Sequence, residues 1–344
     1  MDKRIIFAVA RSGKTSHIIK NLCLEKRHLI TTYTKTNIHN LRLKIIHKFG
    51  FFPENITLLP YFNFLYSFCY RPILAYKLNT SGLSYSNPPD FTQTLSRDND
   101  KHYISSSGRL YHSRLGKLLI RRGATAGIQE RLQKFYDHFY IDEVQDFAGN
   151  DFDLLKEIVK ADINIMLVGD FFQHTYDTSR DGNIYKKLHQ DIEEYIQEFE
   201  NMGLKIDMET LNKNYRCSPT ICDFITNNLG VNIESHRDDT TEIKFEDDKS
   251  KIRDLMQNDQ IIKLFFNKNT SYSCTSRNWG ECKGEDCYND VCVILNATSL
   301  KLYNKKKLLE SAPLTKNKLY VACTRAKGNL YFISHKEAED YKIE

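Results

Sequence analysis

The sequence predicts an α/β fold built on parallel sheets, and the alternation of two kinds of segment along its 344 residues carries that prediction. Short apolar runs rich in β-branched and aromatic residues occur at residues 5–9, 29–33, 139–141, 163–168, 291–295 and 330–333. Segments with a helical pattern, such as 16–24 and 152–159, lie between them. A strand covered by helices on both faces is apolar throughout, which is the pattern of a parallel sheet.

The runs divide the chain into two expected domains. The first four belong to a domain at residues 1–200, and the last two belong to a domain at residues 201–344. The length suits two domains that each bury a core, at roughly 100 to 200 residues per domain. The boundary falls after the strand 163–168 and the helix that follows it.

Two polar stretches interrupt the alternation. Residues 78–108 are rich in Ser, Asn and Asp and contain two consecutive prolines, so we expect a surface insertion in the first domain, within about 70–135. Residues 232–260 hold nine acidic and five basic side chains. They are interpreted as a solvated linker or helix, with a protein-docking site as the alternative.

Composition excludes several classes of protein. With 41% hydrophobic residues, 15 Gly and 7 Pro, the chain is neither collagenous nor disordered. Its longest apolar stretches are far shorter than the roughly 18 residues of a membrane span, and Met1-Asp-Lys-Arg leads into no signal sequence. We therefore expect a soluble, cytoplasmic protein, in a bacterium or a phage-infected host if the resemblance described below holds.

Cysteines and charge give weaker signals. Nine cysteines without a secretion signal favour reduced thiols. The net charge of +5 identifies no partner, but basic side chains concentrate at 1–50, 101–135 and 300–328. These blocks are either parts of one anion-binding face or solvated helix surfaces.

A candidate phosphate site directly follows the first strand, in the sequence Ala8-Val-Ala-Arg-Ser-Gly-Lys-Thr15. A loop leading through Gly-Lys-Thr into a helix supplies what a polyphosphate needs. Gly13 permits close backbone approach, Lys14 supplies positive charge, and Thr15 offers a hydroxyl to Mg²⁺. Ala8 replaces the first glycine of the general pattern, so a basic strand-to-helix turn is the alternative interpretation.

A second motif supports a nucleotide-hydrolysing enzyme. The strand in His138-Phe-Tyr-Ile-Asp-Glu-Val-Gln-Asp146 ends in two adjacent carboxylates. Asp142 is placed to hold Mg²⁺, and Glu143 to polarise the attacking water. A lone strand ending in Asp-Glu is usually structural, but together with Gly-Lys-Thr it favours an NTPase.

Taken together, these motifs resemble superfamily 1 helicases of the UvrD/Rep/PcrA-like branch, whose phosphate loop commonly begins with alanine. Val168-Gly-Asp-Phe-Phe-Gln173, Leu211-Asn-Lys-Asn-Tyr-Arg-Cys-Ser-Pro219 and Leu319-Tyr-Val-Ala-Cys-Thr-Arg-Ala326 are similar to further motifs of the branch. The resemblance implies catalysis by Lys14, Glu143, Gln173, Arg216 and Arg325, the last as an arginine finger. It implies ATP binding by Ala10, Arg11, Ser12, Gly13, Lys14, Thr15, Tyr215 and Glu285.

The same resemblance implies contacts to single-stranded DNA. Ile30-Thr-Thr-Tyr-Thr-Lys35, Phe62-Asn-Phe-Leu-Tyr-Ser-Phe68 and Gly280-Glu-Cys-Lys-Gly-Glu285 look like motifs that contact the strand. The implied contact residues are Tyr33, Thr34, Phe64, Tyr176 and Lys283. Aromatic side chains interleaved with cations are typical of sequence-tolerant stacking.

The activity implied is an ATP- and Mg²⁺-dependent single-stranded-DNA translocase or helicase, moving 3′ to 5′, that hydrolyses ATP at the cleft between two RecA-like domains. RNA as the strand, a protein partner and the oligomeric state are left open. Arg11 stands where the branch commonly has glycine, and the stretch between Arg216 and Lys283 is too short for a second accessory subdomain. The alternative is a DNA-bound ATPase switch or loading factor without productive unwinding.

Two further interpretations are disfavoured. A P-loop kinase acting on a small acceptor would not need Arg216, Arg325 and the aromatic motifs. Cys274, Cys282, Cys287 and Cys292 lack the close pairs typical of zinc sites, so a structural metal there is the minority interpretation. We expect Cys292 and Cys323 to pack in the core.

Overall fold

The computed structural model describes residues 1–175, 181, 184–285 and 287–343. The chain divides into two compact units. The first comprises Met1–Ile6, Lys14–Gly169 and Tyr176–Asp207, and the second comprises Phe7–Gly13, Asp170–Thr175 and Met208–Glu344. The last change from the first unit to the second falls after residue 207. Two short loop segments from within residues 1–200 belong to the second unit.

The first unit is built on a six-stranded sheet in the order β3-β2-β6-β7-β1-β8. The pairs β3·β2, β2·β6, β6·β7 and β1·β8 are parallel. The strands are β1 (Lys3–Phe7), β2 (His28–Thr32), β3 (Ile56–Pro60), β6 (His138–Asp142), β7 (Asn164–Gly169) and β8 (Lys205–Asp207). Because the carboxyl ends of parallel strands share one edge of a sheet, the segments that follow β2, β3, β6 and β7 start from the same edge.

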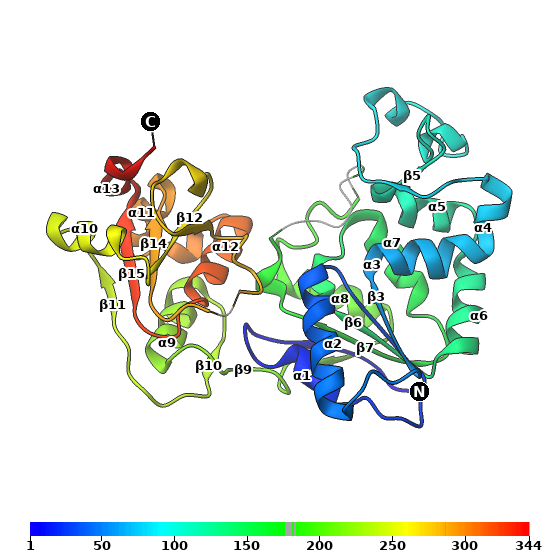
Figure 1. Cartoon of the computed structure of the whole chain (residues 1–344), viewed down its shortest axis with the longest axis horizontal. Helices are drawn as coiled ribbons and strands as arrows, with labels where there is room; N and C mark the ends of the chain where they lie inside the picture. The colour runs from blue at the N-terminus through cyan, green and yellow to red at the C-terminus, as the bar shows by residue number, and fades with distance from the viewer. Residues whose placement is uncertain (176–180, 182–183, 286, 344) are drawn as a thin grey trace. The chain divides into compact units, whose positions relative to one another are not determined.

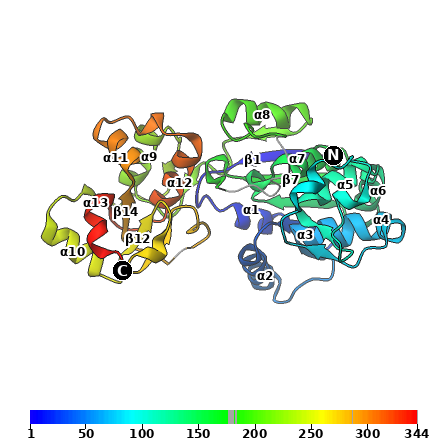
Figure 2. The ribbon, with the colours of Figure 1, turned by 90° about the horizontal axis from the view of Figure 1, so that it is seen from above.

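Helices connect these strands. They are α1 (Lys14–Lys20), α2 (Lys35–Phe49), α3 (Tyr61–Asn63), α4 (Arg71–Leu78), α5 (Leu115–Arg121), α6 (Thr125–Phe135), α7 (Gly149–Ile158) and α8 (Ile192–Asn201). Figure 2 shows α8 on one side of β1 and α1 on the other. A π-helix at Phe64–Tyr70 joins α3 to α4. The sheet is therefore covered on both faces, as its apolar strands require.

The expected insertion has a small core of its own. It carries the short parallel strands β4 (Leu83–Ser84) and β5 (Leu110–Tyr111), with 3₁₀ turns between them. His102 and Tyr103 are buried within it. Buried Arg114 donates to the carboxylate of Asp181 at 2.7 Å and to the backbone oxygen of His102 at 2.6 Å. This polar segment is therefore folded around a charged anchor.

The second unit is built on a five-stranded sheet in the order β11-β15-β14-β12-β13, with every pair parallel. Its strands are β11 (Ile243–Phe245), β12 (Ile262–Phe265), β13 (Ser276–Asn278), β14 (Val291–Leu295) and β15 (Leu330–Ser334). Its helices are α9 (Pro219–Leu229), α10 (Lys249–Gln257), α11 (Ala297–Asn304), α12 (Pro313–Cys323) and α13 (His335–Ala338). A small pair of strands, β9 (Lys213–Asn214) and β10 (Glu234–Ser235), stands apart from the sheet.

Strand β14 shows how this sheet makes two cores. Val291, Val293 and Leu295 pack with α9 and α12, whereas Cys292 and Ile294 pack with α10 and α13. Successive side chains of a strand point to opposite faces, so an all-apolar strand serves both layers. Figure 1 shows α10 and α13 on one side of β15 and α12 on the far side of β14.

The acidic stretch 232–260 contains a helix, as one of its two expected forms, but it is not simply solvated. It contributes β10, β11 and α10, and α10 buries Ile252, Leu255 and Met256. Strand β12 was not predicted from the sequence because Lys263 interrupts its apolar run. That lysine is fully buried, and its Nζ donates to the backbone oxygen of Asn258 at 2.6 Å.

All nine cysteines are free thiols, and Cys292 and Cys323 are buried as expected. Within the described ranges, no group of three or more His, Cys, Asp or Glu side chains is arranged to hold a metal ion. In the same part of the chain, no helix combines the length and the apolar character needed to cross a membrane.

Candidate nucleotide site and strand contacts

The phosphate loop leaves the end of β1 and enters α1 at Lys14. Gly13 has a φ of 89°, which a side chain would strain, so this position needs glycine. Arg11 also adopts a left-handed conformation, with a φ of 55°. Ser12 and Lys14 are buried. A residue with a bulky side chain held at positive φ is typical of functional loops.

Two side chains outside the motif, those of Tyr320 and Asn214, hold this loop. The backbone N–H of Ala10 donates to the hydroxyl of Tyr320 at 2.8 Å, and that hydroxyl donates to Asp170 at 3.0 Å. The side-chain amide of Asn214 donates to the backbone oxygen of Ala10 at 2.7 Å. Sequence reasoning missed Tyr320 and Asn214 as loop supports, although both lie inside quoted motifs. Their pairing with the loop is a long-range contact that spacing does not reveal.

Thr15 and Asp142 come together as the predicted metal pair. The Thr15 hydroxyl donates to Oδ2 of Asp142 at 3.2 Å. The other oxygen of Asp142, Oδ1, is buried and has no hydrogen-bond partner among the described residues. Burial, and then the nearby charge of Glu143, raise the pKa of Asp142 above that of an ordinary aspartate. A buried carboxylate with an unused oxygen beside a hydroxyl fits a hard cation such as Mg²⁺.

Glu143 follows Asp142 in a left-handed conformation, with a φ of 62°. Its carboxylate accepts a short hydrogen bond from the side-chain amide of Gln145. Gly169 at the end of β7 makes room for this pair. A Cβ at Gly169 would lie 2.6 Å from the amide oxygen of Gln145. The motif therefore fixes the Glu143 side chain through a neighbour that requires glycine on the adjacent strand.

Gln173 ends a short 3₁₀ turn, Phe171–Gln173, that begins after β7. The Asp170 side chain caps this turn by accepting from the backbone N–H of Phe172 at 3.1 Å. Gln173 is buried. The Tyr320 hydroxyl, which contacts Ala10, also reaches Asp170, so one tyrosine connects the phosphate loop to the segment that carries Gln173.

Three guanidinium groups converge on one backbone oxygen of the second unit. The carbonyl of Glu285 accepts from Arg216 at 3.0 Å, from Arg325 at 3.2 Å and from Arg11 at 3.3 Å. Arg216 and Arg325 are buried. The Glu285 carboxylate instead contacts Arg277, at 3.3 Å, and the Tyr288 hydroxyl. We call Arg11, Arg216 and Arg325 the arginine cluster.

Tyr215 is 58% exposed, and its ring lies 4.3 Å from that of His236, centroid to centroid. The backbone N–H of Tyr215 donates to the carbonyl of Arg11 at 3.1 Å, which places this ring pair beside the phosphate loop. His236 lies in the acidic stretch and carried no signal in the sequence.

The residues predicted to contact single-stranded DNA in the first unit have different surroundings in the structure. Tyr33 follows β2 and packs against Phe62, at 5.6 Å between ring centroids. The Thr34 hydroxyl caps α2 by accepting from the backbone N–H of Asn37 at 3.1 Å. Phe64, in contrast, is 1% exposed and packs in the core against Phe139, with the two rings tilted. Phe64 is therefore not available to a strand, so that prediction is wrong, whereas Phe62 of the same motif is only half-buried.

Phe62 also joins two aromatic rings of the insertion. His112 lies 5.1 Å and Tyr85 6.1 Å from it, and those two rings lie 5.1 Å apart. Tyr85 is 64% exposed. We call Tyr33, Phe62, Tyr85 and His112 the aromatic platform. Of the other predicted contacts, Lys283 is half-buried, and Tyr176 lies outside the described residues.

The sequence matches no family model and no curated protein. The fold matches solved structures of viral helicases. The arterivirus nonstructural protein 10 helicase in complex with DNA has a TM-score of 0.51 and 13% identity over 96% of this chain and 60% of that chain. A crystal structure of an arterivirus nonstructural protein 10 helicase has a TM-score of 0.49 and 14% identity, covering 99% of this chain and 62% of that chain. The PRRSV helicase has a TM-score of 0.47 and 15% identity, covering 99% and 54%.

This chain thus spans a little over half the length of those helicases. At such low identity the likeness concerns the fold, and the predicted α/β class with RecA-like domains and parallel sheets is confirmed.

Proposed function

We propose that this chain is an ATP-dependent motor on single-stranded DNA, a translocase or helicase of the UvrD/Rep/PcrA-like branch. The observation that carries the proposal is the arginine cluster on the Glu285 carbonyl. Two unit charges 4 Å apart interact by about 4 kcal/mol near a protein surface. Three cations gathered on one neutral oxygen repel one another, and a polyanion such as a triphosphate relieves that repulsion.

The phosphate-loop residues support the same ligand. Gly13 and Lys14 offer backbone and charge to phosphate oxygens, while Thr15 and Asp142 would hold Mg²⁺. The bound Mg²⁺ would neutralise charge on those oxygens. Tyr215, paired with His236, offers an exposed face on which a base can stack.

In the proposed hydrolysis, Glu143 orients the attacking water and accepts its proton. Gln145 holds the Glu143 carboxylate in place. Arg216 and Arg325 stabilise the charge on the transferred phosphoryl group, with Gln173 sensing its presence. In this proposal the arginines act when both domains close on ATP, so that hydrolysis drives opening and movement along the strand.

The aromatic platform is the proposed strand contact of the first unit. Base stacking on aromatic side chains tolerates any sequence and is worth about 1 to 3 kcal/mol per base. Tyr33 and Phe62 rise from the ends of β2 and β3, where parallel sheets bind their ligands, and Tyr85 extends the rings into the insertion. Movement from 3′ to 5′ is proposed from the resemblance.

The decisive experiment measures ATP hydrolysis by the purified protein with single-stranded DNA, duplex DNA and RNA side by side. We expect stimulation by single-stranded DNA. Lys14→Ala should abolish hydrolysis, and Glu143→Gln should lower it by about 10² to 10⁴-fold while ATP still binds. Lys20→Ala, at the exposed end of α1, is the matched control and should remain active. An ATP hydrolysis rate that does not change when single-stranded DNA is added would refute the motor proposal.

One observation favours the second candidate, a DNA-bound switch or loading factor. Residues 217–282 are used for α9, β10, β11, α10, β12 and β13, which build the second unit itself and leave no separate accessory subdomain in the described part of that stretch. A strand-displacement assay separates the two candidates. Efficient unwinding by the protein alone would eliminate the switch.

A further inference from the structure

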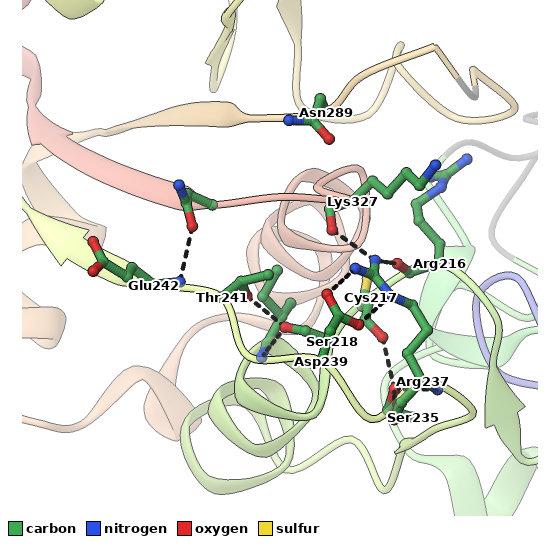
Figure 3. Close-up of polar contacts among 12 residues, drawn as sticks. Arg216, Cys217, Ser218, Ser235, Arg237, Asp239, Thr241, Glu242, Asn289 and Lys327 are labelled. Atoms are coloured by element: carbon green, nitrogen blue, oxygen red, sulfur yellow. Dashed lines mark hydrogen bonds and ion pairs between the residues drawn. The ribbon is translucent and has the colours of Figure 1, made fainter.

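Arg237 lies between β10 and β11, in the acidic stretch, and ties together the two segments that carry Arg216 and Arg325. Its Nη1 donates to the backbone oxygen of Lys327 at 2.6 Å and also to the backbone oxygen of Arg216. Its Nε donates to Oδ1 of Asp239 at 2.6 Å, and its Nη2 pairs with the other oxygen of that carboxylate. Figure 3 shows the Arg237 guanidinium among these three partners.

The surrounding residues fix the geometry of this clamp. The Ser235 hydroxyl accepts from the backbone N–H of Arg237 at 2.9 Å and donates to the carbonyl of Cys217 at 2.8 Å. On the other side, the Asn289 carbonyl accepts from the backbone N–H groups of Lys327, at 2.9 Å, and Gly328, at 2.7 Å. Both backbone segments are therefore held from two directions. Arg237 contacts both segments, and the Arg216 side chain adds a second link, from its Nη1 to the backbone oxygen of Thr324 at 2.9 Å.

We propose that Arg237 is a positioning residue for ATP hydrolysis, acting by holding the backbones of Arg216 and Lys327 at a fixed separation. The inference rests on the proposed function, in which Arg216 and Arg325 contact the phosphates. Arg325 lies two residues before Lys327, so the clamp sets the spacing of the two guanidinium groups.

The chemistry of the residue fits this role better than a stabilising role. An exposed ion pair such as Arg237 with Asp239, with side chains 23% and 45% exposed, adds little to stability. A planar guanidinium, however, binds a carboxylate along one edge while its remaining nitrogen meets two carbonyls. Lysine has no such fork. Phosphoryl transfer is sensitive to placement, because a shift of about 1 Å can cost a hundredfold in rate.

The test compares Arg237→Ala, Arg237→Lys and the control Arg253→Ala, an exposed arginine on α10 of the same unit. We expect Arg237→Ala to lower kcat by about tenfold to a hundredfold with KM for ATP changed less than about threefold. Arg237→Lys, which retains a donor for the carbonyls, should lie between the wild type and Arg237→Ala. Thermal unfolding followed by the fluorescence of Trp279, which is buried in this unit, should be nearly unchanged.

A second readout does not depend on activity. Amide hydrogen exchange in Arg237→Ala should rise at residues 215–218 and 325–328 and stay unchanged in β14 and β15. Unaltered exchange in the two segments would overturn the clamp. The proposal would also be overturned if Arg237→Ala had the wild-type kcat, if only its KM for ATP changed, or if its activity fell only because the protein unfolds. A wild-type protein without ATPase activity would instead refute the proposed function, and the exchange result would still decide the clamp.

Discussion

The stacked histidines at the start of β2 and β6 predict that the first unit loses stability in mild acid. His28 is fully buried, and its ring lies 5.1 Å from that of His138, its partner across the two strands. Nε2 of His28 lies 3.2 Å from the backbone N of Cys23 and 3.1 Å from its backbone oxygen, so this nitrogen accepts from the one or donates to the other according to the tautomer. Burial, and then the charge of His138, lower the pKa of His28 from 6.5 to about 4.

The size of the effect follows from that shift. The unfolded chain takes up a proton at His28 near pH 6.5, but the folded chain resists protonation until about pH 4. Stability from this group is therefore complete above the unfolded pKa and falls as the pH drops through this window. Each pH unit costs about 1.4 kcal/mol, so lowering the pH from about 7 to about 5 removes about 2 kcal/mol.

The perturbation is His28→Phe, which keeps a ring on His138 but cannot titrate. Loss of the hydrogen bond between His28 and the Cys23 backbone destabilises the variant at both pH values, and that offset cancels when the two pH values are compared. The assay is amide hydrogen exchange in β2 and β6 near pH 7 and pH 5, with His39→Phe on the exposed face of α2 as the control. Trp279 fluorescence monitors the second unit separately. An acid-dependent loss of the same size in wild type and His28→Phe would refute the reasoning.

Three further predictions concern the sites. Phe62→Ala should weaken single-stranded-DNA binding by about 1 to 3 kcal/mol in fluorescence anisotropy, and unchanged affinity would remove Phe62 from the strand path. Gly169→Ala puts a Cβ 2.6 Å from the Gln145 amide oxygen and so displaces the side chain that holds Glu143. The rate of ATP hydrolysis should fall by about tenfold or more while ATP still binds, and a wild-type kcat would contradict this prediction. Asp181→Asn leaves the buried charge of Arg114 without its carboxylate, so the free energy of unfolding measured with a chemical denaturant should fall by about 3 kcal/mol. A fall of less than about 1 kcal/mol, the value of a surface ion pair, would argue against the charged anchor.

The sequence was a good guide to those elements whose pattern is local. The run at 291–295 coincides with β14, and the runs at 29–33 and 139–141 match β2 and β6 to within a residue. These strands are apolar throughout because helices cover both faces. Strand β12 was missed because buried Lys263 breaks its apolar pattern. The free-energy cost of burying this lysine is offset by its hydrogen bond to the backbone carbonyl of Asn258. A single sequence gives no sign that a lysine in such a position is buried.

The candidate site divides in the same way. Lys14, Thr15 and Asp142 could be predicted as site residues because strand ends and a Gly-Lys-Thr turn leave a local signature in the sequence. Tyr320 and His236 contact residues that are distant in sequence, and the residues next to them in the sequence form no pattern that predicts these contacts. Phe64 failed for a related reason. In an aromatic run that continues into a π-helix, spacing alone did not show which ring faces the core and which faces solvent.

The side chains of the basic blocks have different surroundings in the structure, which a choice between one anion-binding face and solvated helix surfaces does not describe. Lys48, in the block 1–50, donates to the backbone oxygens of Ile19 and Leu22 at 2.9 and 2.6 Å, and so satisfies carbonyls at the end of α1. Lys305 is solvated, whereas Arg11 and Arg325 lie in the arginine cluster. A charge count treats these side chains as equal. In the proposed function, the anion is bound by guanidinium groups that share one acceptor, and the acidic stretch would contribute to that site through Arg237.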